Sequence, residues 1–359
     1  MDQGGEAAAL PYLRRFADSS GSQWVFAYED ALRKAGRREE LLAFWRTRAA
    51  RPDLPHSERR SVADRMLEAG QKELAEQVLL EMARHAPPES SDVSQILFLW
   101  GPRPAPAALD WLEARARASS GAARAAWLNH LTNAGAPRRA IAVMVGQEPP
   151  PRSAPLDAYL NALVAAHDGA ALSAVLDRAA GLENDPQRLR RFGRLALELG
   201  QNAAARKAYG KLLSVAPSDP EALRRLGVLT YSAADYSAAK GYLARYLSLG
   251  DGDYESNYYY GELLLREKGR GAAQTYYERA LRQIERALPQ IDRSPQTAFA
   301  VRVTRAQLLY RMGRGEESLA AFETLLGQRP RDKNLRADYA AILLDQGRRE
   351  AAQRILSMP

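Results

Sequence analysis

The residue types that most often perform catalysis or bind metals are few in this chain and lie far apart. Cysteine is absent, which excludes disulfides, thiolate nucleophiles, iron–sulfur clusters and cysteine-based zinc sites. The four histidines are His56, His85, His130 and His167, and no two of them have the i, i+4 spacing with which a helix binds zinc. We therefore expect structural histidines and no metal site.

Other catalytic signatures are also missing from the sequence. It contains no glycine-rich phosphate loop, no dinucleotide-binding fingerprint and no nucleophile elbow. Paired carboxylates such as Glu39-Glu40 and Glu316-Glu317 are typical of any charged helix, whereas a catalytic pair needs a desolvated pocket that shifts the pKa of one partner. We predict that the chain is not an enzyme and uses no cofactor.

The most suggestive local motif is DGDYESNYYYGE at 251–262. Its four acidic residues have the spacing of a calcium-binding loop, but Ser256 stands where such a loop requires glycine. In the alternative interpretation, Asp253 caps a helix, and the neighbouring acids favour the positive end of that helix. We favour capping over calcium binding.

Composition indicates a helical protein with a basic but mixed surface. Of the 359 residues, 46% are hydrophobic and 26% charged, and strong helix formers dominate. The net charge is +8, yet arginines alternate with acids in stretches such as GRREE and GRGEES. We read these stretches as solvated helix faces and do not expect nucleic-acid binding. The sequence lacks a signal-like start and any apolar run of the ~18 residues that a membrane span needs.

A fixed period organises the chain. Three residue types recur in one phase, at an interval of 34 residues, over three repeats. They are Gly193, Gly227 and Gly261; Ala205, Ala239 and Ala273; and Asp185, Asp219 and Asp253. A period of this length indicates a solenoid of repeated supersecondary units.

Each residue type has a physical role. The aspartates are suited to cap helix N-termini, and two of them precede a proline, which is favoured at the first helical position. The glycines fall in mid-helix, where glycine costs about 1 kcal/mol relative to alanine. We expect the second helix of each hairpin to approach the first closely at these glycines.

This pattern resembles the tetratricopeptide repeat, in which the first helix carries a small residue and the second an alanine followed by an aromatic residue. The best matching segments are 189–217, 222–249 and 254–288. The resemblance implies an all-α fold: an α-solenoid (right-handed superhelix) of about ten antiparallel helical hairpins over 22–359, after a lead-in helix near 6–18.

We expect three segments along the chain. Residues 1–145 form divergent N-terminal repeats, and the proline-rich stretch at 146–155 is a joint. Residues 156–359 form a C-terminal array that is most regular over 186–288.

The resemblance also indicates where a partner binds, because ligands of this family usually lie in a concave groove lined by the first helix of each hairpin. The repeat phase assigns to this groove Gln187, Arg190, Arg194, Glu221, Arg224, Tyr231, Tyr258, Glu262, Arg266, Tyr310 and Arg311. Arginine and tyrosine contribute much of the binding energy of protein interfaces. We therefore expect a protein partner that presents an extended acidic or aromatic segment.

The resemblance implies a non-catalytic scaffold for protein–protein interaction. The Ala/Arg-rich composition looks bacterial, and similar repeat domains occur in cell-envelope assemblies that synthesise or export exopolysaccharide. On that analogy we favour the periplasm over the cytosol and regard the chain as one domain of a larger membrane-associated protein. Two alternatives stay open: a cytosolic assembly scaffold, and direct binding of an anionic polymer in the Arg-lined groove.

Overall fold

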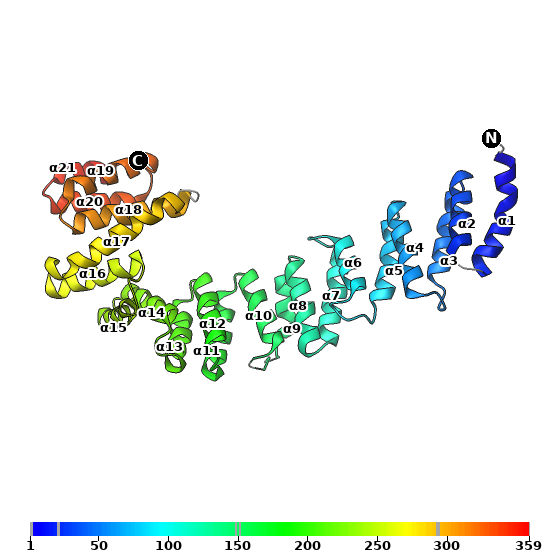
Figure 1. The fold of residues 1–359 in the computed structure, drawn as a ribbon, viewed down its shortest axis with the longest axis horizontal. Coiled ribbons are helices and arrows are strands. Elements are labelled where there is room, and N and C mark those ends of the chain that lie inside the picture. The colour runs from blue at the N-terminus through cyan, green and yellow to red at the C-terminus, as the bar shows by residue number, and fades with distance from the viewer. Residues whose placement is uncertain (1–2, 20–21, 148, 151, 292–294, 359) are drawn as a thin grey trace. The chain divides into compact units, whose positions relative to one another are not determined.

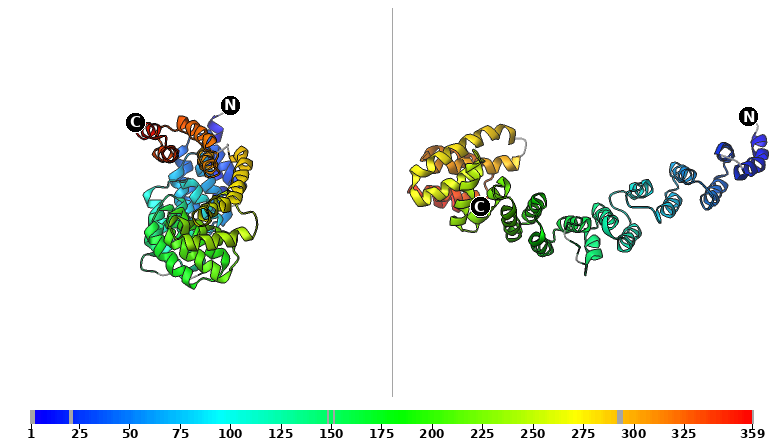
Figure 2. Two further views of the ribbon diagram at one scale, coloured as in Figure 1. Left: turned by 90° about the vertical axis from the view of Figure 1, so that its left-hand side faces the viewer. Right: turned by 60° about the horizontal axis from the view of Figure 1, so that its bottom comes forward.

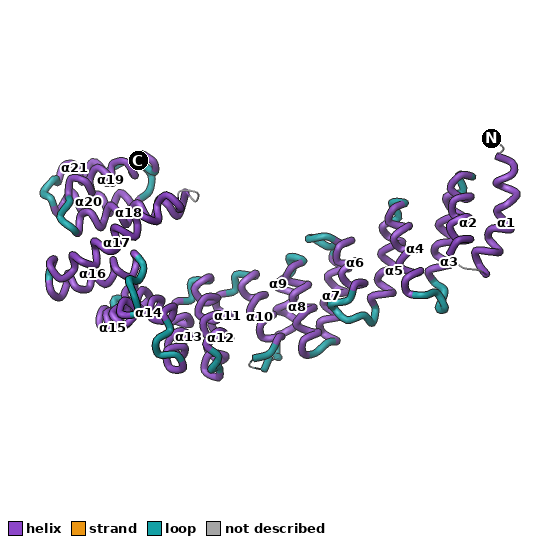
Figure 3. Tube along the Cα trace, viewed as in Figure 1, coloured by secondary structure: helices purple, strands orange, loops and turns teal. Residues whose placement is uncertain are grey.

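The computed structural model describes residues 3–19, 22–147, 149–150, 152–291 and 295–358. Within these residues the regular structure is entirely helical, as Figure 3 shows. Twenty-one helices follow one another in packed sequential pairs (Figure 1). The all-α fold class and the arrangement in helical hairpins are thus confirmed. Among the described helices, none combines the length and the apolar character needed to cross a membrane.

The chain forms two compact units, unit 1 (1–166) and unit 2 (167–359). The boundary between them lies between helices α10 (Ala154–Ala165) and α11 (Gly169–Leu182). The predicted joint at 146–155 includes residues 148 and 151, which lie outside the described residues, and the predicted three-segment division stays a prediction. The right hand of the superhelix also stays a prediction.

Unit 1 begins with a helix that packs mainly on the next helix along the chain. In the right-hand view of Figure 2 most helices of this unit are seen nearly end-on, one after another in chain order. Its helices are α1 (Gln3–Ser19), α2 (Ser22–Lys34), α3 (Arg38–Ala49), α4 (His56–Glu68), α5 (Lys72–Ala83), α6 (Ser91–Trp100), α7 (Pro106–Ala118), α8 (Gly121–Asn133), α9 (Pro137–Met144) and α10 (Ala154–Ala165).

The core of unit 1 includes a row of three tryptophans. Trp127 of α8 is fully buried, and Trp100 and Trp111 pack beside it edge to face, with ring centroids 5.7 and 5.5 Å apart along the row. The guanidinium of Arg115 lies 5.0 Å from the Trp127 ring centroid. In this region α6 packs on α5, whereas α7 packs on α8. The large indole rings fill the space between these two helix pairs.

Unit 2 consists of one helix followed by five hairpins, α12/α13 to α20/α21. In each of these hairpins the first helix has an even number and the second an odd number. The helices are α11 (Gly169–Leu182), α12 (Pro186–Glu198), α13 (Asn202–Val215), α14 (Pro220–Ser232), α15 (Tyr236–Ser248), α16 (Tyr254–Lys268), α17 (Arg270–Ile291), α18 (Pro295–Arg311), α19 (Gly315–Gln328), α20 (Lys333–Asp345) and α21 (Arg349–Leu356).

The mid-helix glycines lie where the paired helix comes closest, as predicted. A Cβ atom placed on Gly193 would lie 2.5 Å from Cζ of Tyr209, and one on Gly261 would lie 2.5 Å from Cε1 of Tyr277. The buried alanines of the same phase precede these tyrosines by one helical turn. The second helix therefore nests a ring directly on the backbone of the first, which only glycine permits at this distance.

The aspartates of the same phase cap their helices. The side chains of Asp185, Asp219 and Asp253 accept hydrogen bonds from backbone N–H groups in the first turns of α12, α14 and α16, at 2.8, 2.9 and 2.7 Å. The capping interpretation of the 251–262 motif is thereby confirmed. Together, the aspartates and glycines determine where each first helix begins and how closely its partner packs.

Candidate partner-binding groove

The residues predicted to line the groove all lie on first helices of unit 2. Gln187, Arg190 and Arg194 are on α12; Glu221, Arg224 and Tyr231 on α14; Tyr258, Glu262 and Arg266 on α16; and Tyr310 and Arg311 on α18. The structure brings Tyr258, Tyr310 and Arg311 together around one pocket. The others form contacts between hairpins or lie on the surface away from that pocket.

Two of the predicted arginines connect successive hairpins. Nε of Arg190 lies 2.8 Å from Oδ2 of Asp219, the carboxylate that caps the next first helix. Arg224, 34 residues later, pairs in the same way with Asp253 and also contacts Glu255 at 2.8 Å. These guanidinium groups are therefore already neutralised by the protein itself.

Arg194 is also paired, although it is exposed. It binds both carboxylate oxygens of Glu221, one of them at 2.7 Å, and the Tyr209 hydroxyl donates to the same carboxylate at 3.1 Å. The hydrogen bond from Arg194 holds the pKa of Glu221 below its ordinary value. Arg194 and Glu221, both predicted to line the groove, thus bind each other. The Tyr209 ring, which packs on Gly193, is hydrogen-bonded to the same carboxylate.

Glu262 lies in the interior instead of facing the groove. This buried carboxylate accepts a hydrogen bond from the Tyr277 hydroxyl at 2.7 Å and lies 2.9 Å from Nε of Arg311. Unit 1 has a parallel arrangement, in which the buried Glu29 accepts from the Trp45 indole at 2.8 Å and pairs with an arginine of the next first helix. In both units a buried acid links its own second helix to the following hairpin.

The remaining predicted residues are spread over the surface and an aromatic cluster. Tyr231 packs against Tyr259, with ring centroids 4.5 Å apart, and the guanidinium of Arg266 lies 4.4 Å from the Tyr236 ring centroid. Gln187 is exposed in the first turn of α12. Arg266 and Gln187 are both exposed, so their polar ends remain in contact with solvent.

The pocket that collects the other predicted residues lies across α16, α18 and α20. It has a volume of about 380 Å³, within the range typical of ligand sites. It is lined by Tyr258, Leu265, Arg270, Gln307, Tyr310, Arg311, Asp338, Ala341, Ile342 and Asp345. Three consecutive first helices, joined by the first residue of α17, therefore contribute to one continuous surface.

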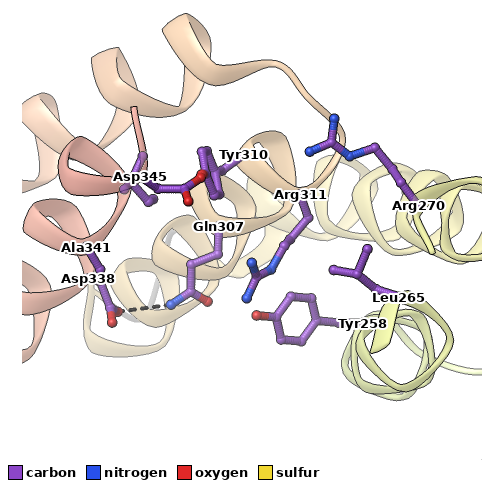
Figure 4. A pocket seen from close by; sticks show the side chains of 10 residues that line it. Tyr258, Leu265, Arg270, Gln307, Tyr310, Arg311, Asp338, Ala341 and Asp345 are labelled. Carbon is purple, nitrogen blue, oxygen red and sulfur yellow. Dashed lines mark hydrogen bonds between the residues drawn. The ribbon is translucent and has the colours of Figure 1, made fainter. Parts of the chain in front are cut away.

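Charges are distributed unevenly around this pocket. In Figure 4 the two acids of α20, Asp338 and Asp345, lie on one side and Arg270 on the other, with Arg311 between them. Arg270 and Asp345 are exposed, and within the described part of the chain neither forms an ion pair. The pocket thus offers a free cation and a free anion on different walls.

Asp338 and Tyr258 are two polar groups of the pocket that are partly withdrawn from water. Asp338 is half-buried, and its carboxylate accepts one hydrogen bond, from Nε2 of Gln307 at 2.9 Å. Burial raises the pKa of Asp338 above its ordinary value, and it also raises the pKa of Tyr258. Among the residues that the structure describes, the half-buried carboxylate of Asp338 has no cation beside it, so a cation supplied by a partner would stabilise its charged form.

Sequence reasoning did not find most of the pocket. It missed Leu265, Arg270, Gln307, Asp338, Ala341, Ile342 and Asp345. A signal was present for some of them, because adding the 34-residue period to Gln307 and Arg311 gives Ala341 and Asp345. Arg270 had no such signal, since it starts a second helix.

Residues 309–358 match the family model of the tetratricopeptide repeat. The matched segment runs from the end of α18 through α21, so a tetratricopeptide repeat is present there. Repeats of this family generally mediate protein–protein interactions, and the fold is typically non-catalytic. No curated protein matches the chain.

Several solved structures are similar to the chain at low identity. The tetratricopeptide repeat protein YrrB, described as having an unusual peptide-binding site, is 19% identical; the match covers 49% of this chain and 84% of YrrB, with a TM-score of 0.35. TTC0263, a repeat protein from Thermus thermophilus, is 22% identical over 53% of this chain and 91% of its own, with a TM-score of 0.33. A repeat protein from Parabacteroides merdae is 17% identical over 83% of this chain and 91% of its own, with a TM-score of 0.31.

Proposed function

We propose that this chain is a non-catalytic scaffold that holds a protein partner in the groove formed by the first helices of α16/α17, α18/α19 and α20/α21. The observation that carries the proposal is the pocket across α16, α18 and α20, which combines two tyrosines with unpaired charge. Tyr258 and Tyr310 offer aromatic contact area, and Arg270 offers a cation to an acidic group. These features suit the extended acidic or aromatic segment predicted from the sequence.

The same observations argue against a polyanion as the main ligand. An anionic polymer would need a row of free cations along the groove, because phosphate or carboxylate neutralisation provides most of its affinity. Arg190, Arg194, Arg224 and Arg311 are instead paired with carboxylates of the neighbouring hairpins. A protein segment with few, specific charges is the better match.

The setting in a bacterial envelope or exopolysaccharide assembly, with a periplasmic location, is part of the proposal. It is supported by the Ala/Arg-rich composition and by the analogy drawn from the repeat family. A cytosolic assembly scaffold is the alternative. Fractionation of the source cells decides between them: recovery of the protein with cytosolic markers alone would contradict the envelope setting.

The experiment that tests partner binding fills the pocket without disturbing the core. Ala341 is exposed and lines the pocket, so Ala341→Trp places an indole inside it. The matched control is Ala320→Trp, an exposed alanine on α19 that does not line the pocket. We expect affinity purification from the source organism to recover the same partner with the wild type and with the control, and to lose it with Ala341→Trp. Equal recovery with both variants would reject this site.

A further inference from the structure

The pocket carries both signs of charge, and this narrows the chemistry of its occupant. Arg270 and Arg311 come from α17 and α18, whereas Asp338 and Asp345 come from α20. Figure 4 shows the acids on one side of the tyrosines and Arg270 on the other. A ligand of a single charge sign would satisfy one wall and be repelled by the other.

Resting on the proposed function, we infer that the partner segment is dipolar: an extended peptide with a lysine or arginine that binds at the acidic wall formed by Asp338 and Asp345, and an acidic group that pairs with Arg270. The segment crosses the tyrosine-lined floor between the two charged walls. It thus differs from the purely acidic or aromatic segment that the sequence predicts.

The acidic wall is suited to a basic side chain. Asp338 and Asp345 are seven residues apart on α20, two helical turns, so they lie on one face about 10 Å apart. Asp338 is half-buried and is held by the neutral amide of Gln307 instead of by a cation. Withdrawing a carboxylate from water without a cationic partner is unfavourable, and a bound lysine or arginine would relieve that penalty.

The basic wall differs in the availability of its two arginines. Arg311 is paired with the buried Glu262, which neutralises its charge and leaves it limited freedom to bind a second acid. Arg270 starts α17, and one of its terminal nitrogens lies over Gly313 at the end of α18. Among the described residues it forms no ion pair, so its five N–H donors are available to an incoming carboxylate.

The open form of the site favours a peptide over a compact ligand. Its lining comes from three successive first helices, so the pocket continues along the row in which those helices are stacked. An extended chain places alternate side chains about 7 Å apart and can address both walls at once.

The test is selection of a phage-displayed library of random linear peptides on the full chain. We expect enriched peptides to carry a lysine or arginine and an aspartate or glutamate at a fixed spacing. Synthetic peptides of the enriched sequence should bind Arg270→Gln and Asp345→Asn about tenfold more weakly than the wild type. The matched controls, Arg206→Gln on α13 and Glu323→Gln on α19, should bind as the wild type does.

The outcomes separate the two proposals. If peptides are enriched and Ala341→Trp blocks them, but they show no paired charges or are insensitive to Arg270→Gln and Asp345→Asn, the dipolar inference is wrong and the groove function stands. If no peptide is enriched, or Ala341→Trp leaves binding unchanged, the groove function itself is wrong. Circular dichroism of each variant confirms that it is folded before binding is interpreted.

Discussion

Replacing one mid-helix glycine should destabilise the protein, although the same change normally stabilises a helix. In Gly193→Ala the new methyl would lie 2.5, 2.6 and 2.8 Å from three atoms of the Tyr209 ring. The ring is fully buried and its hydroxyl is bonded to Glu221, so it has little room to withdraw. Overpacking of this kind costs about 1–3 kcal/mol, and three contacts below 3 Å place this case near the upper end.

The gain from helix propensity offsets part of this cost. Alanine is favoured over glycine in a helix by about 1 kcal/mol, so we expect the free energy of unfolding to fall by about 2 kcal/mol in Gly193→Ala. The matched control is Gly210→Ala in α13, the other helix of the same hairpin, where an added Cβ meets nothing within 4 Å. That change should raise the free energy of unfolding by about 1 kcal/mol.

Urea unfolding followed by far-UV circular dichroism measures both effects. Because the two glycines belong to one hairpin, they report on the same cooperative element. The double variant Gly193→Ala/Tyr209→Ala should lose less free energy of unfolding than the sum of the losses of the two single variants, since the clash between the methyl and the ring is absent. If Gly193→Ala stabilised the protein as much as Gly210→Ala does, the close approach of α12 and α13 would be refuted.

Three further outcomes follow from particular contacts. Ala234→Gly should raise the free energy of unfolding by about 1 kcal/mol, because Ala234 has a φ of 60°, which is unfavourable for alanine. Gly200→Ala, at the equivalent turn with a φ of 68°, should lower the free energy of unfolding by a similar amount. Thermal melts in which both variants shift in the same direction would contradict this. Arg190→Met should destabilise the protein by about 2 kcal/mol, because it leaves the buried carboxylate of Asp219 without its cation. Arg194→Met should cost less than about 1 kcal/mol, because the carboxylate of its partner Glu221 is more exposed. Equal losses of the two variants in urea unfolding would contradict this difference in burial. Because the pKa of Asp338 is raised in the folded state, that state binds the proton more tightly than the unfolded state does, and stability falls as pH rises above about 4. Asp338→Asn should remove this decrease. A pH profile of the melting temperature that is the same in Asp338→Asn and the wild type would contradict the prediction.

Local features of the fold could be predicted from the sequence because each depends on one residue at a fixed position of the 34-residue repeat. Asp219 caps α14 and Gly261 admits the Tyr277 ring, and both follow from helix geometry within one hairpin. Ala234 could not be predicted to adopt its positive φ of 60°, since alanine does not favour that region. In that turn the packing of the flanking helices overrides local preference.

Much less of the candidate site was predictable, because it depends on how neighbouring hairpins are placed side by side. The phase locates Arg190 and Arg224 on the first helices, but their partners lie 29 residues further along the chain. Only the packing of one hairpin on the next shows that these arginines are neutralised. The same applies to Asp338, whose partial burial depends on α18 lying beside α20.

The role of the buried acids follows from this packing. Glu29 and Glu262 each connect three helices, and removal of either carboxylate would leave an arginine without its counter-charge. Such pairs favour one placement of successive hairpins over others, which is how a buried ionic contact contributes specificity. In unit 2 this placement positions Arg311 in the lining of the pocket.

Hydrogen–deuterium exchange of the full chain, with and without a selected peptide, tests partner binding by the first helices of unit 2 most directly. We predict slower exchange on peptide addition in 258–270, 307–311 and 338–345, the segments that line the pocket, and unchanged exchange in α15 and in unit 1. Protection confined to second helices such as α15 or α19, with none in the three pocket segments, would contradict the account.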